Sequence, residues 1–283
     1  MKNTSSILRQ TLLAATLAAS ASLAAAQQAP TEPTAPVITI YTAGSMSGAL
    51  GAITRQYTRE TGQPVQLVSG PAGALLDRIE HSGKADIFVS ANMAHPQRLT
   101  AEGKASPTVV FARNRVCVAA RPDVGLTSAN LLDKLLDPNI KIGTSTPKSD
   151  PGGDYAWELF AKAGTVRPGA TQTLEAKAQQ LVGGAVAPQV PAGQNPVKYF
   201  MTTHRVDVFI GYCSSHEPTP DTTLTQVELP PELAISADYG MTVLDSQQNA
   251  ARRDAAYRLA LYLMSPAAQS VLTRYGFTAV AQQ

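Results

Sequence analysis

Hydrophobic residues along this chain form short β-branched runs, which alternate with longer stretches whose apolar residues recur at helical spacing. Residues 37–42 (VITIYT) predict a buried strand, and Met46, Leu50 and Ile53 behind it are spaced like one face of a helix. The same patterns predict strands at 65–68, 86–90, 116–120, 140–143, 206–212 and 241–244, and helices from 75 to 83 and over 129–136, 154–163, 251–264 and 267–275. This alternation predicts an α/β fold with a parallel sheet covered by helices.

The first 26 residues differ in composition from the rest of the chain. Two basic residues precede a short apolar stretch at 11–23, and three alanines at 24–26 form an A-x-A cleavage pattern. Residues 1–26 are therefore predicted to be a secretory signal peptide. The alternative is an N-terminal anchor helix, but the run is short and rich in Ser and Ala for a membrane span. Residues 27–36 predict a Pro-rich, disordered leader, and we expect the mature protein in the periplasm.

The composition excludes several classes of function. The 283 residues are 44% hydrophobic and 16% charged, which is too apolar for intrinsic disorder. Two of the 23 Lys and Arg residues and none of the 21 Asp and Glu residues lie in the signal segment, so the mature chain is formally neutral. Because there is no basic excess to bind a phosphate backbone, no nucleic-acid partner is expected. The histidines lack metal-ligand spacing, so no metal bound as a cation is expected; they are His81, His95, His204 and His216.

Three loops between a predicted strand and a predicted helix are candidates for ligand binding. They are the turns at residues 42–47 (TAGSMS), 69–73 (SGPAG) and 150–154 (DPGGD), all rich in small or hydroxyl-bearing residues. A helix N-terminus offers unpaired N–H groups and the positive end of a dipole, which suits an anion. Ordinary turn chemistry is the alternative for each loop alone. Three such loops in one exported α/β chain point to a shared anion site.

The sequence also resembles the periplasmic molybdate-binding proteins of ABC importers, which have the type II solute-binding fold. The resemblance rests on "ITIYTAGSMSGAL", "SGPAGALLDRIEHSGKADIFVSAN", "ARNRVCVAARP", "DPGGDYA", "VFIGYCSS" and "LMSPAAQSVLTRYGF", which together cover most of the mature chain. It implies a two-lobed periplasmic-binding-protein-like fold with crossover hinge strands. One lobe would comprise residues 37–112 plus 236–283, and the other residues 113–235.

The resemblance also implies which residues bind the anion. Ser45 would donate its hydroxyl and N–H, Gly152 its backbone N–H and Tyr212 its hydroxyl, while a position near Asn195 would add another N–H. Many family members carry a serine where this chain has Ala72, which keeps the N–H but lacks the hydroxyl. Since a neutral hydrogen bond contributes about 1 kcal/mol, the pocket is expected to bind molybdate more weakly or to admit another ligand.

Two further features leave alternatives open. The carboxylate of Asp154 would oppose a dianion if it faced inward, whereas facing outward it would favour the helix start, which is the orientation we prefer. Export permits a disulfide between Cys117 and Cys213, and two buried free thiols are the alternative.

The function that we expect is capture of a small oxyanion, molybdate or tungstate, by a monomer without a cofactor. As the resemblance implies, the ligand would pass to an ABC permease in the inner membrane with its separate ATPase, and no chemistry would be performed on it. One alternative is a related binding protein for another small ligand. The other is an exported hydrolase with Ser45 or Cys213 as nucleophile, which would need a base within reach.

Overall fold

The computed structural model of this protein describes residues 35–82, 84–185, 187–215, 217–219, 222–245 and 249–280. The predicted signal peptide and all but the last two residues of the predicted leader lie outside these ranges. None of the helices within them is long and apolar enough to cross a membrane.

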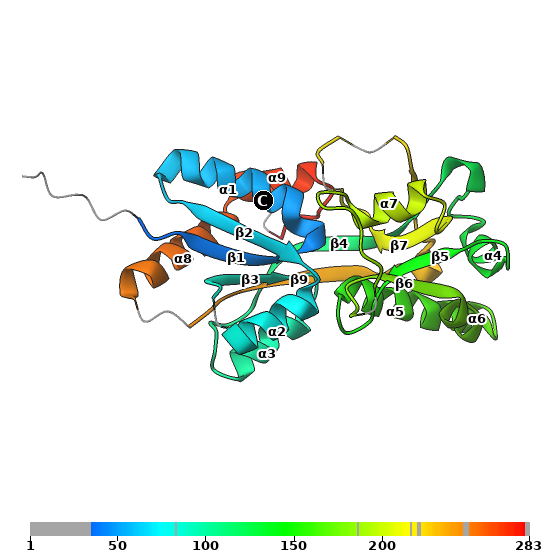
Figure 1. The fold of residues 1–283 in the computed structure, drawn as a ribbon, viewed down its shortest axis with the longest axis horizontal. Helices are drawn as coiled ribbons and strands as arrows, with labels where there is room; N and C mark the ends of the chain where they lie inside the picture. The colour runs from blue at the N-terminus through cyan, green and yellow to red at the C-terminus, as the bar shows by residue number, and fades with distance from the viewer. Residues whose placement is uncertain are drawn as a thin grey trace, which may run out of the picture. The chain divides into compact units, whose positions relative to one another are not determined.

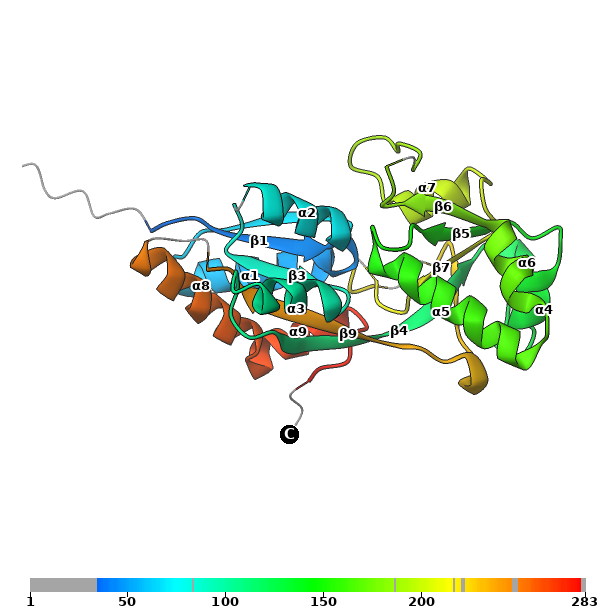
Figure 2. The same cartoon turned by 90° about the horizontal axis from the view of Figure 1, so that it is seen from below.

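The described chain contains a mixed sheet (Figures 1 and 2), and its strands run in the order β2-β1-β3-β9-β4-β7-β5-β6, with β8 also paired to β4. The strands are β1 (Ile38–Ala43), β2 (Val65–Gly70), β3 (Ile87–Ser90), β4 (Val109–Ala120), β5 (Ile142–Ser145), β6 (Ala178–Val182), β7 (Val208–Tyr212), β8 (Thr225–Glu228) and β9 (Ser236–Val243). The prediction of a parallel sheet is correct for β1 with β2 and β3 and for β5 with β6 and β7. It is wrong for β4 and β9, which are antiparallel to each other and to their outer neighbours.

The predicted helices are present with small shifts at their ends. They are α1 (Ser47–Thr61), α2 (Ala72–Ser82), α4 (Leu131–Leu136), α5 (Pro151–Val166), α8 (Ala250–Leu263) and α9 (Pro266–Arg274). The pattern missed α3 (Ala94–Ala101), α6 (Ala170–Lys177), α7 (Pro196–Thr202) and the edge strands β6 and β8. Each missed helix spans at most eight residues and buries only two side chains, so its apolar period is too short to recognise.

Strands β4 and β9 connect two hydrophobic cores. From Val109 to Arg115, β4 pairs with β9; from Val116 to Ala120 it pairs with β7, and over Cys117–Ala120 it also pairs with β8. The first core comes from residues 38–112 and 237–277 and the second from residues 116–235. A crossover at this point is what the predicted hinge strands require, and we propose the predicted lobe boundaries as the division between the two halves.

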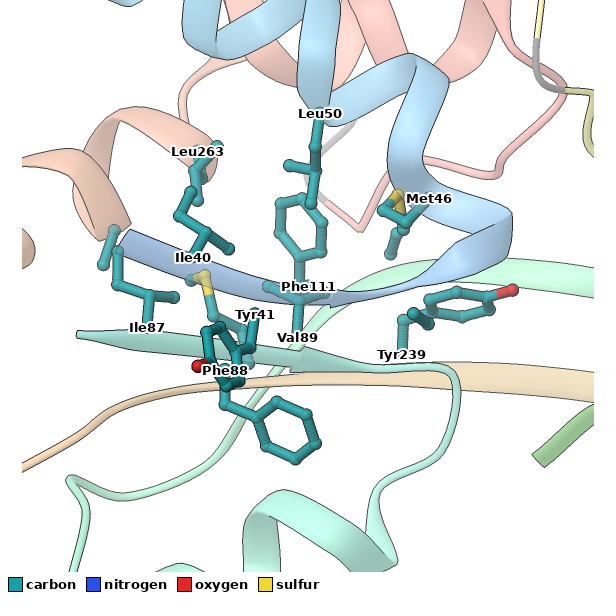
Figure 3. Close-up of a cluster of buried hydrophobic side chains, with 14 of the residues drawn as sticks. Ile40, Tyr41, Met46, Leu50, Ile87, Phe88, Val89, Phe111, Tyr239 and Leu263 are labelled. Atoms are coloured by element: carbon teal, nitrogen blue, oxygen red, sulfur yellow. The ribbon is translucent and has the colours of Figure 1, made fainter. Parts of the chain in front are cut away.

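The first core lies between its sheet and helices on both faces. Figure 3 shows Ile40 and Val89 on neighbouring strands, with Leu50 of α1 and Leu263 of α8 above them. Helices α2 and α3 lie on the opposite face (Figure 1). Packing from both sides explains why β1 and β3 are almost uniformly apolar, as the sequence indicated.

A disulfide joins Cys117 of β4 to Cys213, the residue after β7. These cysteines lie 96 residues apart in the sequence, so the bond closes a long loop, and such bonds typically stabilise a fold by about 2–4 kcal/mol. Of the two alternatives that the sequence left open, the structure has the disulfide. The bond holds the end of β7, including Tyr212, against a crossover strand.

Candidate functional site

The first candidate turn presents Ser45 in a short 3-10 segment, η1 (Gly44–Met46), between β1 and α1. The Ser45 Oγ lies 2.9 Å from the hydroxyl oxygen of Tyr239. Tyr239 is fully buried on β9, and Figure 3 shows its ring beneath the start of α1. The Asn114 amide donates to the same hydroxyl oxygen at 3.3 Å and to the Ser214 Oγ at 2.8 Å. When Tyr239 accepts from Asn114 and donates to Ser45, the Ser45 hydroxyl proton is available to a ligand.

The second candidate turn lies beside the first because β1 and β2 are parallel and in register, with Ala43 opposite Gly70. Ala72 is the first residue of α2 and is fully buried, so a backbone N–H is all that it can offer to a ligand. The next residue, Gly73, donates its N–H to the Ser149 carbonyl at 3.1 Å. That hydrogen bond links a helix of the first core to the loop before α5, a helix of the second core.

The third candidate turn contains a carboxylate at the start of α5. Asp150 is the N-cap residue, and its side chain accepts the Gly152 N–H at 3.2 Å. Asp154 instead accepts the Lys148 N–H of its own loop at 2.8 Å, which agrees with the outward role preferred for it. The carboxylate at the proposed site is thus that of Asp150, which sequence reasoning did not single out. An Asp before a Pro at the first helical position is a recognisable N-cap pattern and could have indicated it.

Tyr212 ends β7 and has a hydroxyl without a partner. Its ring makes edge-to-face contacts with Tyr155 and Tyr239, at centroid distances of 6.1 and 5.8 Å. Among the described residues, the buried Tyr212 hydroxyl makes no hydrogen bond of normal geometry, although the Tyr239 hydroxyl is close enough to act on it. Burial first, and then the nearby Tyr239 and Asp150, raise the pKa of Tyr212 well above its ordinary value. It is therefore a neutral donor, and a buried donor of this kind calls for an acceptor.

These contacts form a closed series that we call the contact ring; it comprises Ser45, Tyr239, Tyr212, Gly152, Asp150, Ser149, Gly73, Ala72, Gly70 and Gly44. Tyr239 connects Ser45 to Tyr212, and a Cβ added at Gly152 would lie 3.7 Å from the Tyr212 ring. Ser149 returns the series to α2, and a Cβ added at Gly44 would lie 3.8 Å from the Gly70 carbonyl oxygen. Four of the five predicted binding positions, Ser45, Ala72, Gly152 and Tyr212, are thereby brought together.

Asn195, the fifth predicted position, makes no described contact with the ring. It caps α7, its side chain accepting the Lys198 N–H at 3.0 Å and its carbonyl accepting the Tyr199 N–H at 2.9 Å. The following residue is Pro196, which has no N–H to offer. Among the described contacts, those of Asn195 stay within α7, so its role as a donor remains a prediction.

Gly183, in the loop that follows β6, is a residue near the ring that the sequence did not indicate. A Cβ added there would lie 2.8 Å from the Asp150 Cβ and 3.3 Å from the Pro71 Cβ. With φ at +86° it also has a backbone conformation that other residues rarely adopt. The start of this loop therefore packs between the second and third turns, and only the spatial arrangement reveals it.

The charged groups near the ring are few. Burial raises the pKa of Asp150, as does the charge of Asp154 to a smaller extent, while hydrogen bonds from Gly152 and Ser145 act in the opposite direction. The arginines beside the crossover are paired outside the ring, as in Arg113–Asp238 at 3.1 Å and Arg115–Glu228 at 2.7 Å. The described residues contain no group of three or more His, Cys, Asp or Glu that could hold a metal ion. The ring therefore offers neutral donors and one carboxylate.

The fold has two cores joined by crossover strands, and the starts of helices from both cores come together between them. This arrangement defines the class of type II solute-binding proteins. Residues 38–278 match the model of the family described as bacterial extracellular solute-binding protein, so the chain belongs to this family. The family's description is that of extracellular proteins that bind solutes, so solute binding is the part of the expected function that the family establishes.

Particular relatives agree with the predicted resemblance. The chain is 34% identical to the uncharacterized protein PM1146 of Pasteurella multocida over 69% of this chain and 80% of that one. It is 25% identical to the molybdate-binding protein ModA of Haemophilus influenzae over 86% of this chain and 90% of that one. The fold also matches the structure of the periplasmic molybdate-binding protein of Azotobacter vinelandii, with a TM-score of 0.69. The two chains are 16% identical, and the match covers 87% of this chain and 100% of the other. The resemblance and the fold class predicted from the sequence are thereby confirmed.

Proposed function

We propose that this chain captures a small tetrahedral oxyanion within the contact ring and delivers it to a membrane permease driven by a separate ATPase. Molybdate and tungstate are the first ligands that we propose, because the sequence resembles the molybdate-binding family and a relative over most of its length is a molybdate-binding protein. The observation that carries the proposal is the buried Tyr212 hydroxyl without an acceptor. We also propose export by residues 1–26 and a periplasmic location.

The proposed donors suit an oxyanion because they carry no counter-charge. The Ser45 and Tyr212 hydroxyls and the N–H of Ala72 would each meet a ligand oxygen, with the N–H of Gly152 and Asn195 as further candidates. Donors at helix starts stabilise an anion through fixed dipoles. Selectivity then depends on the size of the ring and on donor directions, and closure of the two lobes over the ligand would exclude water.

The hydrolase alternative finds less support in the surroundings of its two candidate nucleophiles. The Ser45 hydroxyl bonds to Tyr239, whose pKa is raised by burial, so that partner is a neutral hydroxyl rather than a base. Cys213 is held in the disulfide and has no thiolate to attack with. A binding protein for another small ligand is the better second candidate, because Ala72 lacks a hydroxyl and Asp150 adds a carboxylate.

Titration calorimetry with molybdate, tungstate, sulfate and phosphate tests the proposal on protein purified from the periplasm without refolding. We expect heat and a higher melting temperature with molybdate or tungstate, and Ser45→Ala should weaken binding about tenfold through a lost hydrogen bond to a charged ligand. The matched control is Ser82→Ala, at an exposed serine that bonds within its own helix. If no anion binds, the proposed function is wrong, and an unchanged Ser45→Ala affinity would move the site elsewhere.

Tyr239→Phe is expected to weaken oxyanion binding about fivefold, because Ser45 loses the partner that directs its hydroxyl proton toward the ligand. The phenyl ring retains the packing against Tyr212 and Phe277, so the fold should be kept. Because the two hydroxyls act in series, the double variant with Ser45→Ala should bind no more weakly than Ser45→Ala alone. Tyr262→Phe, which removes a hydroxyl bonded to Glu60 instead, is the control. Additive losses in the double variant would contradict this coupling.

A further inference from the structure

Asp150 is the one carboxylate of the contact ring, and an anion site has no evident use for it. Its oxygen accepts the Gly152 N–H at 3.2 Å, which is the donor that the family resemblance assigns to the ligand. The carboxylate therefore already occupies one donor that a bare oxyanion would otherwise receive. In exchange it brings an ionisable carboxyl group, with its oxygen lone pairs, to the ring.

The surroundings of Asp150 do not neutralise the charge of its ionised form. Within the described part of the chain it takes part in no salt bridge. Its titratable neighbours are Asp154 on the same helix and the Tyr212 and Tyr239 hydroxyls from β7 and β9, and Ser145 supplies a hydrogen bond. Pro71 and Gly183, which lie beside it, carry no charge. An unpaired carboxylate in such a place repels an aprotic dianion.

A ligand that carries a proton meets the same group differently. Sulfate, molybdate and tungstate are aprotic dianions near neutral pH, whereas phosphate and its monoesters retain a proton in part. An O–H on the ligand can donate to a carboxylate in a short, charge-assisted hydrogen bond. The ring would then match the ligand completely, with hydroxyls and N–H groups facing its bare oxygens and Asp150 facing its O–H.

We propose that Asp150 is a specificity-determining residue of this site, which accepts a proton-bearing oxygen of the ligand and so favours phosphate-class oxyanions over aprotic dianions of the same shape. The inference rests on the proposed function, since it assumes that the contact ring binds a tetrahedral oxyanion. Molybdate and tungstate would then bind more weakly than the same ring with a neutral residue would allow. Specificity of this kind comes from a repulsive element as much as from an attractive one.

Proton uptake provides a second, independent consequence. The pKa of Asp150 is already raised by burial, and an adjacent dianion would raise it further. Binding of sulfate or molybdate should therefore draw a proton from solution onto Asp150. Phosphate can bring its own proton and should draw fewer.

The test compares phosphate with sulfate, which are close in size and shape, in wild type and in Asp150→Asn. Asparagine remains a good helix N-cap, so the fold should be retained, but its amide can donate to the ligand. We expect wild type to prefer phosphate by about tenfold or more, and the variant to bind sulfate and molybdate about tenfold more tightly and phosphate more weakly. Calorimetry in two buffers of different ionisation enthalpy should show proton uptake with sulfate in wild type and none in the variant.

Asp154→Asn is the matched control, because it removes the same charge from the same helix turn while its side chain bonds to the Lys148 N–H outside the ring. If both variants change the phosphate-to-sulfate ratio equally, or if Asp150→Asn leaves it unchanged, the inference is overturned. If oxyanions bind but wild type takes up no proton with sulfate, the inference is likewise overturned, while the proposed function stands. If neither wild type nor variant binds any of these anions, the proposed function fails and the inference fails with it.

Discussion

Gly73→Ala is expected to weaken oxyanion binding about ten- to hundredfold while leaving the fold intact. A Cβ at this position would lie 2.5 Å from the Lys148 carbonyl oxygen and 2.7 Å from the Ser149 carbonyl oxygen. Both are backbone atoms, so no flexible side chain can move aside. The same approach allows the Gly73 N–H to donate to Ser149 at 3.1 Å, and the added methyl group would push these groups apart.

The effect should appear in binding rather than in stability because of where the two partners belong. Gly73 lies at the start of α2, next to Ala72 in the first core, while Ser149 precedes α5 of the second core. If the two lobes open and close as we propose, the clash exists only when they are closed. Overpacking costs about 1–3 kcal/mol, and that free energy would be lost from ligand binding. Within the helix itself, alanine is favoured over glycine.

Calorimetry, thermal unfolding and small-angle scattering with and without ligand would measure these outcomes. The control is Gly51→Ala in α1, where the added Cβ would meet only the movable end of the Arg55 side chain, at 3.2 Å. We expect the control variant to bind like wild type. Gly73→Ala should keep its two lobes open even in the presence of ligand. Wild-type affinity in Gly73→Ala would show that this close approach is not needed for binding. A large loss of stability without ligand would show that the contact also holds the unliganded protein together.

Asp86→Asn is expected to lower the free energy of unfolding by about 2–4 kcal/mol. Asp86 is fully buried just before β3 and pairs with Arg252 of α8 through both oxygens, at 2.7 and 2.8 Å. It also accepts the Thr39 N–H at 2.7 Å, so one side chain joins β1, β3 and α8. An amide can accept from Thr39 but cannot balance the guanidinium, which would be left largely unpaired. The partial exposure of Arg252, 27% of its side chain, keeps the loss from being larger.

Chemical denaturation of Asp86→Asn and of Glu102→Gln would separate buried from exposed pairing. Glu102 contacts Arg98 at 3.1 Å on the surface, and pairs of this kind contribute about 0–1 kcal/mol. Neither residue belongs to the contact ring, so the folded fraction of each variant should bind oxyanion like wild type. Equal effects on stability in the two variants would mean that the Asp86–Arg252 pair does not hold α8 against the sheet.

The elements that the sequence predicted well are those with a long or uniform apolar pattern. Helix α1 buries residues of its predicted face, and it ends at Gly62. Strand β3 is buried throughout because both faces of the sheet are covered, and three of its four residues are apolar. Helix α7 could not be recognised, since only Phe200 and Met201 of its seven residues are buried. Strand β8 has only Val227 buried, because it lies at an edge and pairs with β4 alone.

The residues of the candidate site also divide into those with a recognisable local pattern and those without one. Ser45, Ala72, Gly152 and Tyr212 were predictable because they lie in local motifs, at the ends of strands and starts of helices, that resemble a known family. Tyr239 was not, since it reaches Ser45 from β9, 194 residues later in the chain. Its role depends on a long-range hydrogen bond rather than on any local pattern.

By itself, the sequence determined the α/β alternation and the small turns that precede helices, because periodicity and turn chemistry are local properties. The solute-binding family was indicated separately, by the resemblance of its motifs. Tertiary structure alone decided that Cys117 and Cys213 are bonded, that β4 and β9 cross antiparallel between two cores, and that Asp150 rather than Asp154 is the carboxylate at the ring. These outcomes depend on which distant segments come into contact and on which N–H each carboxylate accepts. Such choices are made by packing and hydrogen bonding across the whole fold.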